Sequence, residues 1–137
     1  MRAKGYTVLG YLSVGSVSDE QQKYYKILKP YRLSKLEDWP HEWYIDLRKE
    51  FVRDFLINRA KEISNFGFQG LWLDNLDVYE YHKSTDMYNS IITLLKSIRT
   101  INASNYIMVN GGSEFLDKLM DKDSKHNTIT YINGVTQ

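Results

Sequence analysis

Residues 68–77 (FQGLWLDNLD) constrain the fold of this chain more than any other stretch, because an apolar run leads directly into two carboxylates. Residues 68–73 have the pattern of a strand buried on both faces, which is typical of a parallel sheet covered by helices. The loops after such strands carry functional groups because they vary over a rigid scaffold. The position of Asp74 and Asp77 therefore predicts a functional site, with capping of the next helix as the alternative.

The composition excludes several classes of function. With 137 residues, of which 42% are hydrophobic, the chain is long enough for one cored domain. Its 18 basic and 17 acidic side chains give a net charge of +1, without the electrostatic footprint of a protein that binds nucleic acid. No apolar run approaches the roughly 18 residues that span a bilayer. Cysteine is absent and the three histidines lack metal-ligand spacing, so we expect neither a metal nor a cofactor.

Strand and helix patterns alternate along the chain. The expected strands cover residues 6–14, 43–47, 68–73, 106–109 and 128–135, and the expected helices cover 18–28, 49–65, 85–100 and a short segment from 113. Ser18 is the expected N-cap of the first of these helices, and residues 4–5 are interpreted as the end of an earlier helix.

Five strands joined by helical crossovers predict an α/β fold of parallel βα repeats. Because a closed eight-stranded barrel typically needs about 250 residues, we expect a single, incomplete TIM-barrel domain over residues 1–137, comprising about strands two to six. The outer strands of such a sheet expose unpaired backbone groups, and this favours self-association through the uncovered edges.

Polar side chains gather where the expected strands begin or end. They are Ser13 and Gly15, then Glu42, Asp46 and Arg48, then Asp74, Asn75 and Asp77, then Asn110, and finally Asn133 on the last strand. Carboxylates, amides and aromatic rings on one face of a sheet suit glycoside hydrolysis, which needs one carboxyl as acid and another as nucleophile or base. A phosphate site would instead need a glycine-rich loop with a lysine, which this sequence lacks.

Three blocks, residues 9–16 (LGYLSVGS), 39–48 (WPHEWYIDLR) and 67–77 (GFQGLWLDNLD), occur in a characteristic order and spacing. In these blocks the chain resembles glycoside hydrolase family 114, the endo-alpha-1,4-polygalactosaminidases, and their bacterial TIM-barrel relatives. The resemblance implies an endo-acting, retaining hydrolase of an amino-sugar-containing polysaccharide, secreted or held at a bacterial cell surface.

The resemblance also assigns roles to single residues. Asp74 matches the family's catalytic nucleophile, with Asn75 and Asp77 as neighbours that shape the site. The residues that match positions lining or bracing the same cleft are Tyr11, Glu42, Asp46 and Arg48. Asn110 is expected to bind substrate because it lies at the exit of the next strand. A structural ion pair is an equally open interpretation of Asp46 and Arg48, as is anchoring of the long loop for Glu42 and barrel filling for Tyr11. Trp39 and Trp43 are interpreted mainly as packing residues.

The family's general acid and base, a glutamate at the end of the sixth barrel strand, has no match within these residues. The resemblance implies that it would follow Gln137. We therefore expect the parent protein to hydrolyse its substrate and this chain alone to be inactive.

Two other functions remain open at this point. The first is a carbohydrate-binding TIM-barrel module that keeps the cleft and lacks the chemistry. The second is an unrelated flavodoxin-like domain that binds a small anion or a metal through Asp74 and Asp77, since paired carboxylates can hold Mg²⁺.

Overall fold

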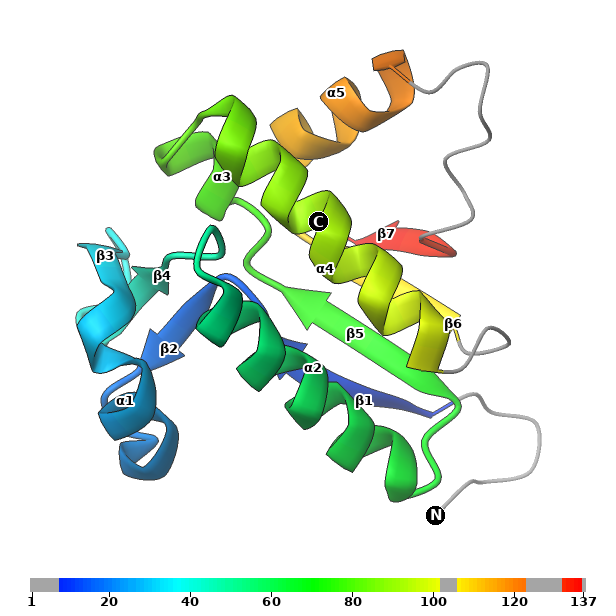
Figure 1. Cartoon of the computed structure of the whole chain (residues 1–137), viewed down its shortest axis with the longest axis horizontal. Helices are drawn as coiled ribbons and strands as arrows, with labels where there is room; N and C mark the ends of the chain where they lie inside the picture. The colour runs from blue at the N-terminus through cyan, green and yellow to red at the C-terminus, as the bar shows by residue number, and fades with distance from the viewer. Residues whose placement is uncertain (1–7, 102–105, 123–131, 137) are drawn as a thin grey trace.

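A parallel sheet with helices packed on one face forms the body of the molecule (Figure 1). The computed structural model describes residues 8–101, 106–122 and 132–136. Within these residues the parallel strands stand in the order β1 (Leu9–Ser13), β5 (Gly70–Asp74), β6 (Tyr106–Asn110) and β7 (Gly134–Thr136). Each neighbouring pair is parallel, as the βα pattern predicts.

Helices connect successive strands of this sheet. They are α2 (Glu50–Asn65) before β5, α4 (Thr85–Ile101) before β6 and α5 (Ser113–Lys122) after β6. In Figure 1, α2 and α4 run side by side across the sheet. Both bury apolar residues at helical spacing, for example Val52, Leu56 and Ala60 in α2. These three elements confirm the helices expected at 49–65, 85–100 and from 113.

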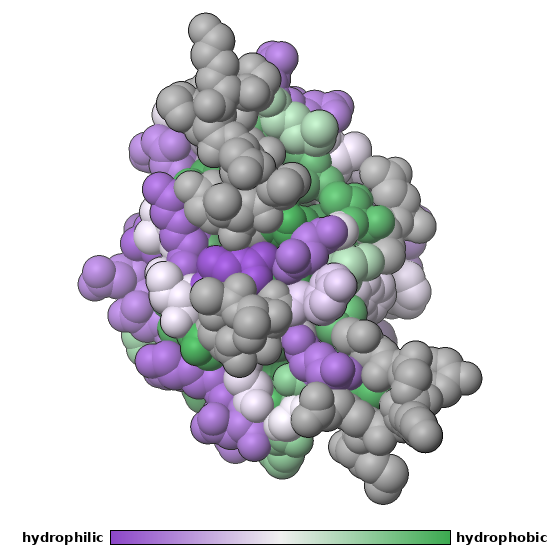
Figure 2. All heavy atoms as spheres, turned by 90° about the vertical axis from the view of Figure 1, so that its right-hand side faces the viewer, coloured by the Kyte–Doolittle hydropathy of each residue, from purple (hydrophilic) through white to green (hydrophobic). Residues whose placement is uncertain are grey.

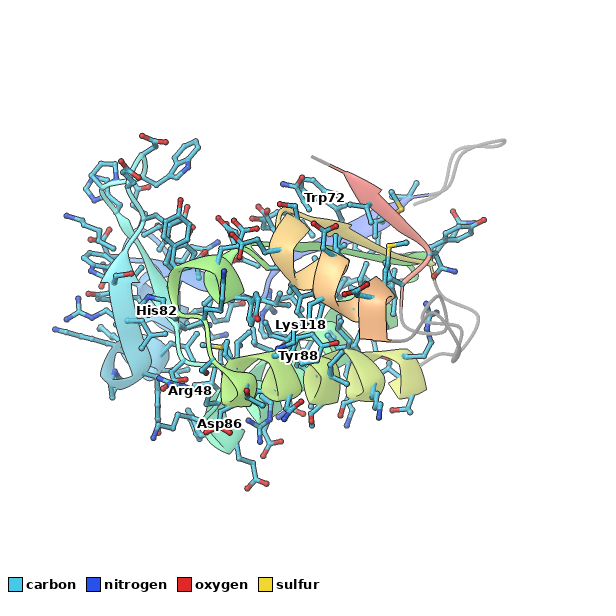
Figure 3. All side chains as sticks on the ribbon, turned by 90° about the horizontal axis from the view of Figure 1, so that it is seen from above. Arg48, Trp72, His82, Asp86, Tyr88 and Lys118 are labelled. Atoms are coloured by element: carbon cyan, nitrogen blue, oxygen red, sulfur yellow. The ribbon has the colours of Figure 1, made fainter. Side chains whose placement is uncertain are left out.

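The two faces of the parallel sheet differ because side chains alternate along each strand. Leu12, Leu73 and Val109 are buried. On the opposite face Tyr11 and Trp72 are neighbours in register, and their ring centroids lie 5.4 Å apart. Figure 3 shows Trp72 on the side of the sheet turned away from α4.

A second, antiparallel sheet stands beside the carboxyl end of β1. Its strands are β2 (Ser16–Ser18), β4 (Glu42–Ile45) and β3 (Arg32–Lys35), in that order. Between β2 and β3 lie α1 (Gln22–Leu28) and a 3₁₀ turn at Lys29–Tyr31.

The parallel placement expected for residues 43–47 is therefore wrong, and so is the count of five parallel strands. β4 pairs antiparallel with both β2 and β3, and β1 pairs directly with β5. The local pattern identified a strand correctly, but the choice of partner depends on the chain reversal between β3 and β4, where Leu36 N–H donates to Glu42 O.

Smaller differences concern the ends of elements. Ser18 is the last residue of β2 and its Oγ accepts a hydrogen bond from Glu20 N–H, so it is not the N-cap of α1, which begins at Gln22.

Asn133 precedes β7 and therefore lies at the amino end of that strand, away from the strand exits. A short helix, α3 (Val78–Tyr81), was not expected. The expectations for residues 4–5 and 128–131 fall outside the described residues.

The face at the amino ends of the parallel strands shows hydrophilic and hydrophobic side chains interspersed (Figure 2). Among the described residues, none of the helices has both the length and the apolar character needed to cross a bilayer.

The turn after β1 lies against the turn after β5. Val14 N–H donates to Asp74 O over 3.1 Å, and a Cβ added to Gly15 would lie 1.8 Å from the backbone oxygen of Asn75. Only glycine fits this contact, because the obstacle is backbone and cannot rotate away. Gly15 thereby sets how closely the two turns approach.

Replacing Gly15 with alanine should lower the free energy of unfolding by about 3 kcal/mol, because the methyl group forces the two turns apart. The matched control is Gly67→Ala, where no atom lies within 4 Å of the added Cβ and only the positive φ of 92° is costly. That control should lose about 1 kcal/mol. Urea denaturation measures both, and equal losses would contradict the role assigned to Gly15.

Candidate functional site

A cleft of about 360 Å³ opens at the carboxyl ends of β1, β5 and β6. Its lining consists of Tyr11, Leu36, Trp39, Glu42, Asp74, Asn75, Asp77, Asn110 and Gly111. The structure thus brings together six of the eight site residues expected from the sequence. The other two, Asp46 and Arg48, are not among the lining residues.

Asp74 is the most heavily hydrogen-bonded carboxylate of the cleft. Oδ2 accepts a hydrogen bond of 2.8 Å from the Tyr11 hydroxyl. Oδ1 accepts two, from Asn110 Nδ2 at 3.0 Å and from the backbone N–H of Asn75 at 2.9 Å. These three hydrogen bonds fix the orientation of the carboxylate. Burial, together with the hydrogen bond to Asp74, raises the pKa of the Tyr11 hydroxyl, which stays a donor.

Asn75 occupies the left-handed region of backbone conformation, with φ of 69°. Asparagine tolerates this region better than other residues that carry a Cβ. The conformation turns the chain sharply after β5, directly after the peptide whose N–H donates to the Asp74 carboxylate. The local geometry therefore depends on the residue type at position 75.

Asp77 lies deeper in the cleft wall and is half-buried. Its Oδ2 accepts a hydrogen bond of 2.9 Å from the hydroxyl of Tyr44, whose ring stacks on Tyr81. Burial raises the pKa of Asp77, the Tyr44 hydrogen bond opposes the rise, and the nearby carboxylates of Glu80 and Asp74 add to it. The environments of the two aspartates thus differ. Asp74 accepts three hydrogen bonds. Asp77 accepts one from the side chain of Tyr44 and lies near the carboxylates of Glu80 and Asp74.

Negative groups dominate this end of the molecule. Glu42, Asp74 and Asp77 line the cleft, and among the described residues no lysine or arginine contributes to its lining. An adjoining hollow of about 290 Å³ shares Asp77 with the cleft and adds Glu80. Such a surface favours a ligand that carries positive charge or many hydrogen-bond donors.

Comparison with known proteins places the chain in a family. The model of glycoside-hydrolase family GH114 matches residues 1–122. This chain belongs to family GH114. The resemblance seen in the three sequence blocks is thereby confirmed. The comparison with curated proteins gives no match.

Solved structures agree with the GH114 assignment. The glycoside hydrolase domain of PelA from Pseudomonas aeruginosa is similar at 25% identity and a TM-score of 0.69, over 84% of this chain and 47% of that one. Ega3 from Aspergillus fumigatus, solved with galactosamine, is similar in fold at 19% identity and a TM-score of 0.70, over 93% of this chain and 55% of that one. An alpha-galactosidase from Thermus thermophilus shares the fold at 12% identity and a TM-score of 0.64, over 91% of this chain and 27% of that one.

The chain spans about half the length of the PelA and Ega3 structures that it matches. The neighbours are TIM-barrel glycoside hydrolases, and the four parallel strands form a barrel-like part of that fold. The expected partial TIM barrel is confirmed, with the small antiparallel sheet inserted after β1.

Several residues of this GH114 site were missed or misjudged from the sequence. Trp39, interpreted mainly as a packing residue, is 62% exposed and lines the cleft. Trp43 packs as expected, against the ring of Tyr25. Tyr44 was not singled out, although alternation along β4 places it on the side opposite Trp43 and Ile45. The side of β4 that faces the cleft became clear only once its antiparallel partners were known.

Asp46 and Arg48 form an ion pair outside the cleft, which fits the structural alternative. Arg48 Nε and Nη2 donate to the two carboxylate oxygens of Asp46 over 2.7 and 3.0 Å. In Figure 3, Arg48 lies near Asp86, on the α4 side of the sheet. Burial opposes ionisation of Asp46, which is 6% exposed, but the hydrogen bonds from Arg48 outweigh it and lower the pKa of Asp46.

Replacing Arg48 with methionine should destabilise the fold in a pH-dependent way. The pKa of Asp46 is lower in the folded chain than its ordinary value of 3.8. The stability that the ion pair contributes is therefore complete above pH 3.8 and is lost as the pH falls through the folded pKa. At pH 7 the variant should lose about 1–2 kcal/mol, a range that allows for the exposure of Arg48. The difference should shrink as the pH falls below 3.8 and through the folded pKa of Asp46.

Chemical denaturation at several pH values tests this, with Lys61→Met as the control. Lys61 is exposed on α2, and its replacement removes the same charge without leaving a buried carboxylate. A loss at pH 7 that is the same for both variants would contradict the account of the ion pair.

Proposed function

We propose that this GH114 chain supplies the nucleophile side of a retaining glycoside hydrolase that acts within an amino-sugar polysaccharide. The observation that carries the proposal is Asp74, a carboxylate held by three donors at the exit of a central strand in an open cleft. Family membership supports the reaction class, and the carboxylate lining supports a substrate that bears ammonium groups.

In the proposed mechanism Asp74 attacks the anomeric carbon of the sugar. A bond forms between its carboxylate oxygen and that carbon while the glycosidic C–O bond breaks, and a carboxylic acid protonates the leaving oxygen. Water then attacks the glycosyl ester, the same acid group now takes a proton from the water, and Asp74 is released as a carboxylate. Tyr11 and Asn110 hold both oxygens of Asp74 in place during the attack.

The acid group of this mechanism is not assigned to the cleft residues described above. As the family resemblance implies, we expect a glutamate at the end of the sixth barrel strand to take this role in the parent protein. Asp77 is assigned a supporting role beside the nucleophile, since its carboxylate is engaged by Tyr44.

The walls of the cleft suit a sugar chain. Trp39 is an exposed aromatic ring on one side, and Tyr11 is 52% exposed at the floor. Aromatic faces pack on the apolar faces of pyranose rings, while the carboxylates between them bind ammonium and hydroxyl groups. The galactosamine bound in the Ega3 structure supports a substrate of the same chemistry here.

Replacing Asp74 with asparagine should abolish hydrolysis of a galactosamine-rich polysaccharide. The amide is isosteric but cannot form the glycosyl ester, so kcat should fall by about a thousandfold or more. The assay measures release of reducing ends by the protein produced from its complete gene.

Asp54→Asn is the matched control, since Asp54 is an exposed aspartate on α2 that does not line the cleft. It should retain full activity. Unchanged turnover in Asp74→Asn would refute the assignment, and saccharide binding without any hydrolysis by the parent protein would favour the carbohydrate-binding module instead.

Replacing Tyr11 with phenylalanine should lower kcat by about 10- to 100-fold while the protein stays folded. The change removes the hydrogen bond to Asp74 Oδ2 and leaves the ring in place, and a hydrogen bond to a charged group contributes about 1.5–3 kcal/mol. Steady-state kinetics and a thermal melt measure the two effects. A variant that is as active as the native protein would show that Tyr11 does not orient the nucleophile.

A further inference from the structure

A line of hydrogen bonds runs beneath the cleft from Asn75 to Glu42. Asn75 Nδ2 lies 2.8 Å from Ser13 Oγ, Ser13 Oγ lies 2.9 Å from Ser16 Oγ, and Ser16 Oγ lies 2.7 Å from Glu42 Oε2. Ser16 is only 3% exposed and is one of few buried polar residues among those described. Buried polar groups of this kind need partners, and both neighbours of Ser16 in this line supply them.

The direction of each hydrogen bond follows from the charge at one end. A carboxylate only accepts, so the single proton of the Ser16 hydroxyl points to Glu42. Ser13 must then donate toward Ser16, whose backbone oxygen also lies within reach at 3.2 Å. The Ser13 oxygen is thereby left to accept from Asn75, and every donor in the line points toward Glu42.

This direction also fixes the orientation of the Asn75 amide. If the amide were rotated by 180°, its oxygen would face Ser13 and require the Ser13 proton. The contact between Ser13 and Ser16 would then have no proton between two oxygens 2.9 Å apart. With one N–H of Nδ2 committed to Ser13, the carbonyl oxygen Oδ1 is the acceptor atom left on a side chain that lines the cleft.

We propose that Ser13 and Ser16 are positioning residues that make Asn75 an acceptor toward the substrate and so select an ammonium group over a hydroxyl group. An ammonium group has donors only, whereas a hydroxyl both donates and accepts. An Asn75 side chain locked with its oxygen toward the cleft binds both, and it binds the ammonium group more strongly because a hydrogen bond from a charged donor is stronger than one from a neutral donor. One that is free to turn its NH₂ group toward the cleft repels ammonium and still binds hydroxyl. This inference rests on the proposed function, because it names the group of the sugar that Asn75 recognises.

The same line of hydrogen bonds steadies the nucleophile. Asn75 is held in a left-handed conformation, and its backbone N–H donates to Asp74 Oδ1. The side-chain bond to Ser13 ties this strained residue to β1. Recognition of the sugar and orientation of Asp74 therefore share one residue.

The test replaces Ser16 with alanine, which interrupts the line without altering a residue of the cleft lining. Binding of a galactosamine oligosaccharide and of a galactose oligosaccharide of the same length and linkage is measured by calorimetry. The variant should bind the galactosamine probe about tenfold more weakly, because one hydrogen bond to a charged group is lost. Its affinity for the galactose probe should stay within about twofold of that of the native protein.

Ser18→Ala is the matched control, since Ser18 lies on the same strand and its hydroxyl bonds only locally, with Glu20 N–H. It should leave both affinities unchanged. A Ser16→Ala variant with the native preference for galactosamine would overturn the proposal, as would one that loses affinity for both probes equally.

A second measurement separates this inference from the proposed function. In ¹⁵N NMR spectra the Asn75 side-chain NH₂ signals should shift and exchange faster with water in Ser16→Ala, and stay unchanged in Ser18→Ala. If the native protein binds neither probe, the proposed function fails while these signals still report on the line of hydrogen bonds. If the signals of Ser16→Ala match those of the native protein, the inference fails whatever the probes do.

Discussion

The site depends on the direct parallel pairing of β1 with β5, which places Ser13 opposite Asp74. The two strands end at the same level, and the turns that follow them meet where Gly15 leaves room for the backbone of Asn75. Each turn supports the other: Val14 N–H binds Asp74 O, and Asn75 Nδ2 binds Ser13 Oγ. Asp74, the proposed nucleophile, is therefore held by its neighbour Asn75 and by Tyr11, which lies 63 positions earlier in the chain. Asn75 is itself held by Ser13, 62 positions earlier.

The antiparallel sheet inserted after β1 has a functional consequence. Because β4 reverses direction relative to β2 and β3, it brings Glu42 to the cleft and Tyr44 to Asp77, and the loop before it brings Trp39. In a regular βα barrel this stretch would be one more parallel strand. Here it forms one wall of the cleft, while the turns after β5 and β6 form the other. The ion pair of Asp46 and Arg48 follows β4 directly and lies on the side of the sheet that carries the helices.

Charge distinguishes the cleft from the rest of the molecule. The chain as a whole is almost neutral, yet the cleft lining formed by residues 8–101 and 106–122 includes three carboxylates and no lysine or arginine. The carboxylates are not equivalent, because Asp74 receives three hydrogen bonds whereas burial raises the pKa of Asp77. Different environments for neighbouring carboxylates suit the roles proposed above, with one carboxylate as nucleophile and the others as substrate-binding groups.

The sequence by itself determined the βα order, the amphipathic helices 49–65 and 85–100, the family, and the grouping of Asp74, Asn75, Asp77 and Asn110 at strand exits, because these follow from periodicity and from local motifs. Only the tertiary structure decided that β4 belongs to an antiparallel sheet. It also decided that Asp46 pairs with Arg48 outside the cleft and that Ser16 connects Glu42 to Ser13. The physical reason is that strand partners and hydrogen-bond partners are chosen over long separations in the chain, where many pairings satisfy the same local pattern.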